Sequence, residues 1–202
     1  MMLSLQGLDF DDAIRHLEAN SYQRLAEGDW AYVYQAPHTS RVVRITPYDP
    51  AYLLFVQTCW MFPHRNLPSY YALIRLAGCG YAVEMPCYAP EDSSLRKEFL
   101  AALEAAMVAE SDRSELAFLA QILKRGIAAG KLLVPYFFGL DMNIDNVMLE
   151  GRTPKLVDGF GQAGSIITEG IAKGLPLELS RAEIESFLTI PFHRRGQKQY
   201  RE

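Results

Sequence analysis

The chain has 202 residues, of which 50% are hydrophobic and 22% are charged, so it is expected to fold as a globular protein with a sizeable core. Its formal net charge of -4 gives no support for a basic nucleic-acid-binding face, and its three cysteines lack the spacing of a zinc site or a disulfide framework. There is no apolar run that could span a bilayer and no secretory signal, so we expect one cytoplasmic, monomeric domain over residues 1–202, without nucleic-acid or membrane partners.

Hydrophobic periodicity and turn residues predict alternating groups of strands and helices. In chain order we expect a helix over residues 11–20, strands around a turn at Gly28 and over 30–34, a strand over 41–45, a helix over 50–62, strands over 69–76 and 80–85, helices over 91–107 and 114–130, an irregular segment over 162–175, a helix over 180–188 and a frayed tail over 193–202. Asp11 or Asp12 is predicted to cap the first helix, Gly130 to end the long one, and Ser180 with Glu183 to form a capping box.

The most informative stretch is a polar loop that carries Asp141 and, five residues on, Asn146. The apolar residues 147–149 predict a short strand, a turn follows over 150–154, and a second short strand ends at Asp158. A hairpin of this kind would hold Asp141, Asn146 and Asp158 at one end. Two carboxylates and a carboxamide suit a hard cation such as Mg²⁺, which also binds substrate phosphates.

The motifs from Gly28 to Gly161 resemble, in order and spacing, those of protein kinases. Asp141 and Asn146 are similar to the catalytic loop, in which four residues separate the Asp from the Asn. The segment from Asp158 to Gly161 resembles the metal-binding Asp-Phe-Gly motif but reads Asp-Gly-Phe-Gly. Further matches are the glycine turn at Gly28, the lysine position at Arg44, the His-x-Asn-Leu turn from His64 to Leu67, and the hinge at Glu84 and Met85.

The resemblance implies a minimal two-lobed kinase-like fold of the α+β class. Its β-rich N-lobe would cover about residues 1–85 and its truncated helical C-lobe about residues 86–202. The short C-lobe resembles that of minimal serine/threonine kinases of T7-like bacteriophages and of small bacterial type III effector kinases, including the one that phosphorylates host Hsp90. A protein substrate, such as a host chaperone in the host cytosol, is what this resemblance implies.

The resemblance also implies roles for individual residues. Asp141 would orient the attacking hydroxyl and accept its proton, Asn146 and Asp158 would bind Mg²⁺ or Mn²⁺, and Asp158 would also count as catalytic. The residues implied to hold ATP are Gly28, Arg44, Glu84, Met85, Asn146 and Asp158.

Departures from the kinase pattern leave other functions open. Arg44 stands where kinases have a lysine, and no Glu lies between Arg44 and Glu84 to pair with it. Gln57 is the only polar residue in the middle of the intervening helix that could reach inward. These features favour a pseudokinase or binding module, whereas the intact Asp and Asn residues favour an active kinase. A small-molecule phosphotransferase of the aminoglycoside type is a further alternative, although such enzymes have a larger helical lobe.

Overall fold

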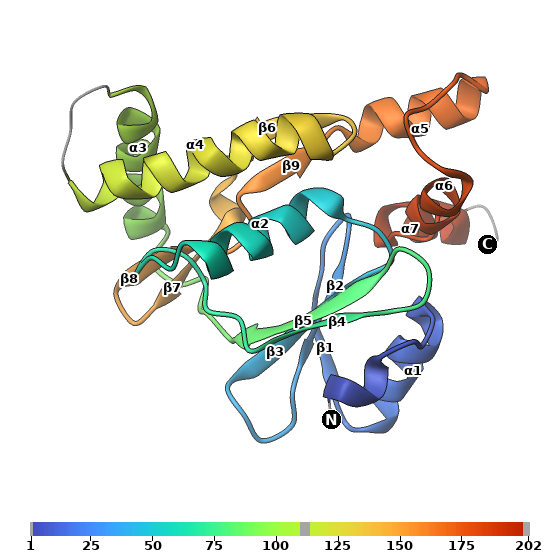
Figure 1. Cartoon of the computed structure of the whole chain (residues 1–202). Coiled ribbons are helices and arrows are strands. Elements are labelled where there is room, and N and C mark those ends of the chain that lie inside the picture. The colour runs from blue at the N-terminus through green and yellow to red at the C-terminus, as the bar shows by residue number, and fades with distance from the viewer. Residues whose placement is uncertain (1, 110–113, 200–202) are drawn as a thin grey trace. The chain divides into compact units, whose positions relative to one another are not determined.

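The computed structural model describes residues 2–109 and 114–199, and this part of the chain contains seven α-helices and one five-stranded sheet (Figure 1). The predicted α+β class is confirmed. Contacts divide the chain into two compact units, here called the sheet unit and the helical unit. The sheet unit comprises the described residues of Met1–Asp49, Tyr70–Cys87 and Glu178–Glu202, and the helical unit those of Pro50–Ser69 and Tyr88–Leu177.

Each unit is assembled from segments that are distant in the sequence. The sequence predicted one boundary between two lobes, near residue 85. In the structure, Pro50–Ser69 belongs to the helical unit and the described residues of Glu178–Glu202 belong to the sheet unit. None of the described helices is long and apolar enough to cross a lipid bilayer.

The sheet unit is built on an antiparallel sheet with the strand order β1-β2-β3-β5-β4. Its strands are β1 (Gln23–Glu27), β2 (Tyr32–Gln35), β3 (Arg41–Thr46), β4 (Ala72–Arg75) and β5 (Tyr81–Pro86). Alternating residues of β2 and β3, namely Tyr32, Tyr34, Val43 and Ile45, enter one buried cluster with the apolar face of α1 (Phe10–Ala19). This packing fixes the register of the strands, because a shift of one residue would turn every one of these side chains to the opposite face of the sheet, away from α1.

The helix α1 begins at Phe10, slightly earlier than predicted, because its cap is Asp9 rather than Asp11 or Asp12. The carboxylate of Asp9 accepts a hydrogen bond from the Asp12 N–H at 2.7 Å, and this bond lowers the pKa of Asp9. A short 3₁₀ helix, η1 (Met2–Leu5), precedes it. The helix ends at Ala19, and Asn20 is its C-cap, so the prediction that Asn20 stops the helix is confirmed.

The C-terminal part of the sheet unit forms two helices, α6 (Arg181–Phe187) and α7 (Pro191–Gln199). The predicted capping box of Ser180 and Glu183 is confirmed. The predicted frayed tail is wrong for the residues up to 199, which are helical, while residues 200–202 of that tail lie outside the described residues.

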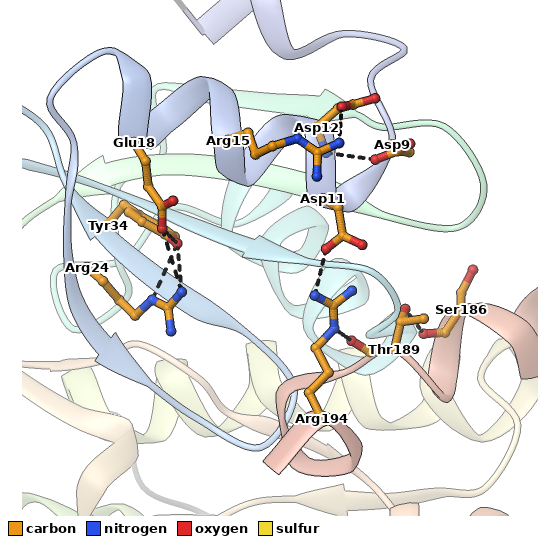
Figure 2. A network of polar contacts seen from close by, with 10 residues as sticks. All are labelled: Asp9, Asp11, Asp12, Arg15, Glu18, Arg24, Tyr34, Ser186, Thr189 and Arg194. Carbon is orange, nitrogen blue, oxygen red and sulfur yellow. Dashed lines mark hydrogen bonds and ion pairs between the residues drawn. The ribbon is translucent and has the colours of Figure 1, made fainter. Parts of the chain in front are cut away.

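Contacts of Arg194 explain part of this order in a polar, basic segment. Figure 2 shows its guanidinium between two elements of the sheet unit: it pairs with Asp11 of α1 at 2.6 Å and donates to the carbonyl of Thr189 at 2.7 Å. The same guanidinium also lies over the ring of Phe10, with 4.9 Å between its central carbon and the ring centroid. The helix α7 has few apolar residues that could pack against the rest of the unit, so these bonds of Arg194 help to hold it in place.

The helical unit contains the remaining helices and two small antiparallel sheets, β6-β9 and β7-β8. Its elements are α2 (Pro50–Met61), α3 (Ser93–Val108), α4 (Glu115–Leu133), β6 (Phe137–Leu140), η2 (Ile144–Asn146), β7 (Val147–Glu150), β8 (Thr153–Leu156), β9 (Phe160–Gln162) and α5 (Gly164–Lys173). The fully buried residues Phe55, Leu103, Leu119, Ile122 and Leu123 show that its core lies among α2, α3 and α4.

Two predictions for the helical unit are wrong. Gly130 does not end α4, which continues to Leu133; the glycine is present because the ring of Phe137 packs where a side chain would stand. The segment 162–175 is not irregular, since α5 occupies most of it. This helix is fixed by the buried Ile167 and ends at Gly174, whose φ of 63° suits a helix C-terminus.

Candidate functional site

The loop that follows β6 holds Asp141 and Asn146 in place through their backbones. The N–H of Asp141 donates to the carbonyl of Gly159 at 2.9 Å. The side-chain amide of Asn146 donates to the carbonyl of Asp141 at 3.2 Å, and the carbonyl of Asn146 accepts from the N–H of Val157 at 2.8 Å. Asp158 lies between the two residues that make these backbone bonds, so the structure brings Asp141, Asn146 and Asp158 together.

The small sheets explain why these residues meet. In the β7-β8 hairpin, Val147 pairs with Leu156, so Asn146 before β7 and Asp158 after β8 emerge at the same end. In the other sheet, Leu140 pairs with Phe160, which places Asp141 beside the start of β9. The convergence that the sequence predicted from one hairpin is therefore produced by two adjacent strand pairs.

Two glycines around the loop have structural reasons that the sequence did not reveal. Gly139 has a φ of 113°, a conformation that residues with a side chain rarely adopt. At Gly159, an added Cβ would lie 2.6 Å from the ring of Phe55 and 2.8 Å from the side chain of Leu156. The extra glycine in Asp-Gly-Phe-Gly thus lets the chain pass close to α2, and Phe160 then packs edge-on against Phe55 at 5.4 Å between centroids.

The donor set of the site suits a hard divalent cation. Asp141, Asn146 and Asp158 are half-buried and offer carboxylate and amide oxygens, the ligand types that Mg²⁺ and Mn²⁺ prefer. Mg²⁺ usually takes only one or two protein carboxylates and completes its shell with water and substrate phosphates. In the described part of the chain, no cluster of three or more His, Cys, Asp or Glu residues forms a separate metal site.

Arg96 of α3 supports the loop, and sequence analysis missed it. Its guanidinium donates to the carbonyls of Ile144 and Val147, each at 3.2 Å. Asp145, which lies between them, is exposed, and its N–H is held by the side chain of Asn143 at 3.0 Å. An arginine on an amphipathic helix carries no sequence signal of such a role, because most face solvent.

The His-x-Asn-Leu turn also supports the hairpin. The amide of Asn66 donates to the carbonyl of Pro154 at 2.8 Å, and its carbonyl accepts from the N–H of Leu156 at 2.9 Å. Within the turn, Nδ1 of His64 accepts the N–H of Asn66 at 3.1 Å. Burial lowers the pKa of His64, while its contact with Glu115 at 3.4 Å opposes that shift.

The predicted nucleotide residues Gly28, Arg44, Glu84 and Met85 belong to the sheet unit. Gly28 lies in the turn between β1 and β2, where its N–H donates to the carbonyl of Ala31 at 2.9 Å. The turn is held by α7: Arg195 donates to the carbonyl of Gly28 at 3.4 Å and pairs with Glu27 at 3.3 Å and with Asp29. No local pattern in the sequence indicated that the C-terminal helix holds this turn.

Arg44 has an acidic partner that the sequence analysis did not identify. One of its terminal nitrogens lies 2.8 Å from a carboxylate oxygen of Asp49, and both side chains are buried. Gln57 does not reach inward, because its side chain is exposed on α2. The partner comes from the residue directly before α2 rather than from the middle of the helix.

Glu84 and Met85 lie within the sheet. Glu84 is opposite Val43 and Met85 is opposite Val42 in β3. The carbonyl of Glu84 accepts the N–H of Tyr71 at 2.8 Å, and its carboxylate pairs with Arg41 at 3.3 Å. Their backbones therefore take part in the strand ladder.

No protein-family model matches the chain, and no curated protein matches it. Among solved structures, the chain is similar to the crystal structure of Rad53 1-466 in complex with AMP-PNP, with a TM-score of 0.40 and 15% sequence identity. The match covers 95% of this chain and 61% of the Rad53 chain. A similarity of this degree assigns no family and no activity to the chain.

Proposed function

We propose that the chain is an atypical phosphotransferase that uses ATP with Mg²⁺ or Mn²⁺ and transfers the γ-phosphate to a serine or threonine hydroxyl of a protein. The observation that carries the proposal is the convergence of Asp141, Asn146 and Asp158, which are bonded through Gly159 and Val157 at the ends of two strand pairs. A base and two metal-binding groups on one rigid scaffold are the protein parts that phosphoryl transfer needs.

Each residue has one role in the proposed reaction. Asp141 orients the substrate hydroxyl and accepts its proton, while the hydroxyl oxygen bonds to the γ-phosphorus and the bond from that phosphorus to the bridging oxygen of ADP breaks. Asn146 and Asp158 hold the metal, which neutralises charge on the phosphates when bound. Gly28 and Arg44 are the proposed phosphate contacts in the sheet unit, and Glu84 and Met85 the proposed adenine contacts.

A protein substrate is favoured over a small molecule. Aminoglycoside-type enzymes line their substrate pocket with acids from a large helical lobe, and among the described residues of the helical unit only α5 follows β9. We propose further that the protein acts as a monomer in the cytosol, the host cytosol if it is an effector, and that its substrate is a host protein such as a chaperone.

A binding module without transfer activity is the second candidate. It is favoured by the arginine in the place of the kinase lysine, by the lack of a glutamate in α2, and by the engagement of the Glu84 carbonyl in the sheet. Such a module would bind nucleotide or a partner protein without turnover.

The test is an assay with γ-labelled ATP and Mg²⁺ or Mn²⁺, on the purified protein alone and in a cell lysate, followed by phosphoamino acid analysis. Label in serine or threonine that depends on Asp141 supports the proposal. Folded wild-type protein that binds ATP but transfers no label under either metal would instead support the binding module.

A further inference from the structure

The ion pair between Arg44 and Asp49 is buried in the sheet unit. The charged groups lie 2.8 Å apart, with 10% and 7% of the two side chains exposed. Pairs of this kind contribute little net stability compared with apolar residues of similar size, because both charges lose their hydration. Removal of one partner is nevertheless costly, because it leaves the other charge buried and uncompensated. The pair therefore fixes the position of the guanidinium more than it adds to the free energy of unfolding.

The chain around Asp49 is itself held in place. Its carbonyl accepts the hydroxyl of Tyr81 from β5 at 2.7 Å. Three residues earlier, the hydroxyl of Thr46 donates to the carbonyl of Trp30 at 2.7 Å and accepts the N–H of Tyr48 at 3.2 Å. Asp49 is thus fixed to β5, and the segment that leads to it is fixed to the turn that contains Gly28.

We propose that Asp49 is the positioning residue for Arg44 and directs its guanidinium to the phosphates of the nucleotide. This inference rests on the proposed function, in which Arg44 contacts those phosphates. A guanidinium presents its five N–H donors in a rigid fork, so a carboxylate that holds one nitrogen also sets the direction of the others. Asp49 thereby supplies the carboxylate that pairs with Arg44, which was expected from a glutamate, and no glutamate lies between Arg44 and Glu84.

Two other residues that could have paired with Arg44 are excluded by their exposure or by another partner. Gln57 is exposed on α2. The carboxylate of Glu84 pairs with Arg41, on the outer end of β3, at 3.3 Å.

The test combines calorimetric Mg-ATP affinity with thermal melting for a set of variants. Asp49→Asn keeps the size of the side chain and removes its charge. It is expected to weaken Mg-ATP binding by about 10- to 100-fold, the loss that is typical when the partner that orients a metal ligand is removed. Asp49→Glu keeps the charge and should retain part of the affinity. Glu185→Gln, which breaks an exposed pair with Arg181 on α6, is the matched control and should bind as wild type does.

The reciprocal double variant Arg44→Asp with Asp49→Arg separates positioning from stability. It retains an ion pair, so it should melt closer to wild type than Asp49→Asn, but it has no cation at position 44 and should bind Mg-ATP no better than Arg44→Ala. If Asp49→Asn is unfolded, the comparison of Asp49→Glu with the double variant still separates the two roles.

Two results would overturn the inference in distinguishable ways. If wild type binds Mg-ATP and folded Asp49→Asn binds it equally well, or the double variant recovers wild-type affinity, Asp49 does not position Arg44. If wild type itself shows no Mg-dependent binding, the proposed function fails, and the inference that rests on it fails too.

Discussion

Asp141 and Asp145 share one loop but differ in their surroundings, which makes them a matched pair. The backbone of Asp141 is bonded to Gly159 and to Asn146, so removal of its carboxylate leaves those loop contacts intact. We expect Asp141→Ala to reduce transfer by about 10²- to 10⁴-fold with little change in ATP affinity, since a general base contributes about that much. The measurement is label transfer together with ATP titration.

Asp145→Ala is the control for this prediction. Its carboxylate is exposed and has no role in the proposed mechanism, so the variant should remain active. An inactive Asp145→Ala beside an active Asp141→Ala would show that the wrong carboxylate has been assigned.

The close packing around Gly159 predicts how a substitution there changes stability. A Cβ at this position meets the ring of Phe55 and the side chain of Leu156, so Gly159→Ala should destabilise the protein by about 1–3 kcal/mol, the usual cost of overpacking. Gly196→Ala is the control, because nothing lies within 4 Å of an added Cβ there, and alanine favours the helical conformation. A melting temperature of Gly159→Ala equal to that of wild type would contradict the close approach of the chain at Gly159 to α2.

The lowered pKa of His64 predicts how the stability of the fold depends on pH. Burial lowers its pKa below the ordinary value of 6.5, so below that value the unfolded chain binds more protons than the folded one. This contribution is fully present above pH 6.5 and is lost as the pH falls through the folded pKa; His193, whose pKa burial also lowers, acts in the same direction. The melting temperature should therefore decrease as the pH is lowered from about 7.5 to about 5.5.

A pair of variants tests the assignment to His64. His64→Asn, which can still accept the N–H of Asn66, should flatten the pH dependence. His38→Asn changes an exposed histidine whose φ of 56° asparagine tolerates, and it should leave the dependence unchanged. A wild-type melting temperature that rises on acidification would contradict the account.

At the scale of elements, α7 is the largest departure from expectation. The sequence 191–199 is polar and basic, a pattern typical of a frayed end. Its order depends on specific partners, among them Asp11 for Arg194 and Asp29 for Arg195 and for the N–H of Phe192. Partners that are more than a hundred residues away in the sequence cannot be found from periodicity, which reports only local repeats.

The contacts of α7 predict that Arg195 restrains the turn at Gly28. Arg195→Ala removes the bonds to the Gly28 carbonyl and to the two flanking acids, so amide hydrogen exchange at Gly28 should become faster. The melting temperature should change by only a few degrees, about what exposed ion pairs contribute. Arg181→Ala, which loses its pair with Glu185 on α6, should leave exchange at the turn as in wild type. Unchanged exchange in Arg195→Ala would show that α7 does not restrain it.

At the scale of the whole molecule, the order of helices and strands was predictable from α1 to α4, whereas β6, α5, α7 and several supports of the site were not. Strand and helix periodicity predicted the elements around Gly28, Arg44 and Asn146, and one hairpin predicted the convergence of Asp141 with Asp158. Arg96 and α7 were missed because their importance comes from contacts between distant segments. Asp49 is only five residues from Arg44, but it was missed because the partner of Arg44 was expected within the following helix.

The most direct test of the central claim, that Asp141, Asn146 and Asp158 form one metal and nucleotide site, is a calorimetric titration of ATP with and without Mg²⁺. Wild type and Asp145→Ala should bind ATP in a Mg-dependent manner, Asp141→Ala should bind it nearly as well, and Asp158→Ala should lose the Mg-dependent part of the affinity. Folded Asp158→Ala that binds Mg-ATP as tightly as wild type would contradict the account.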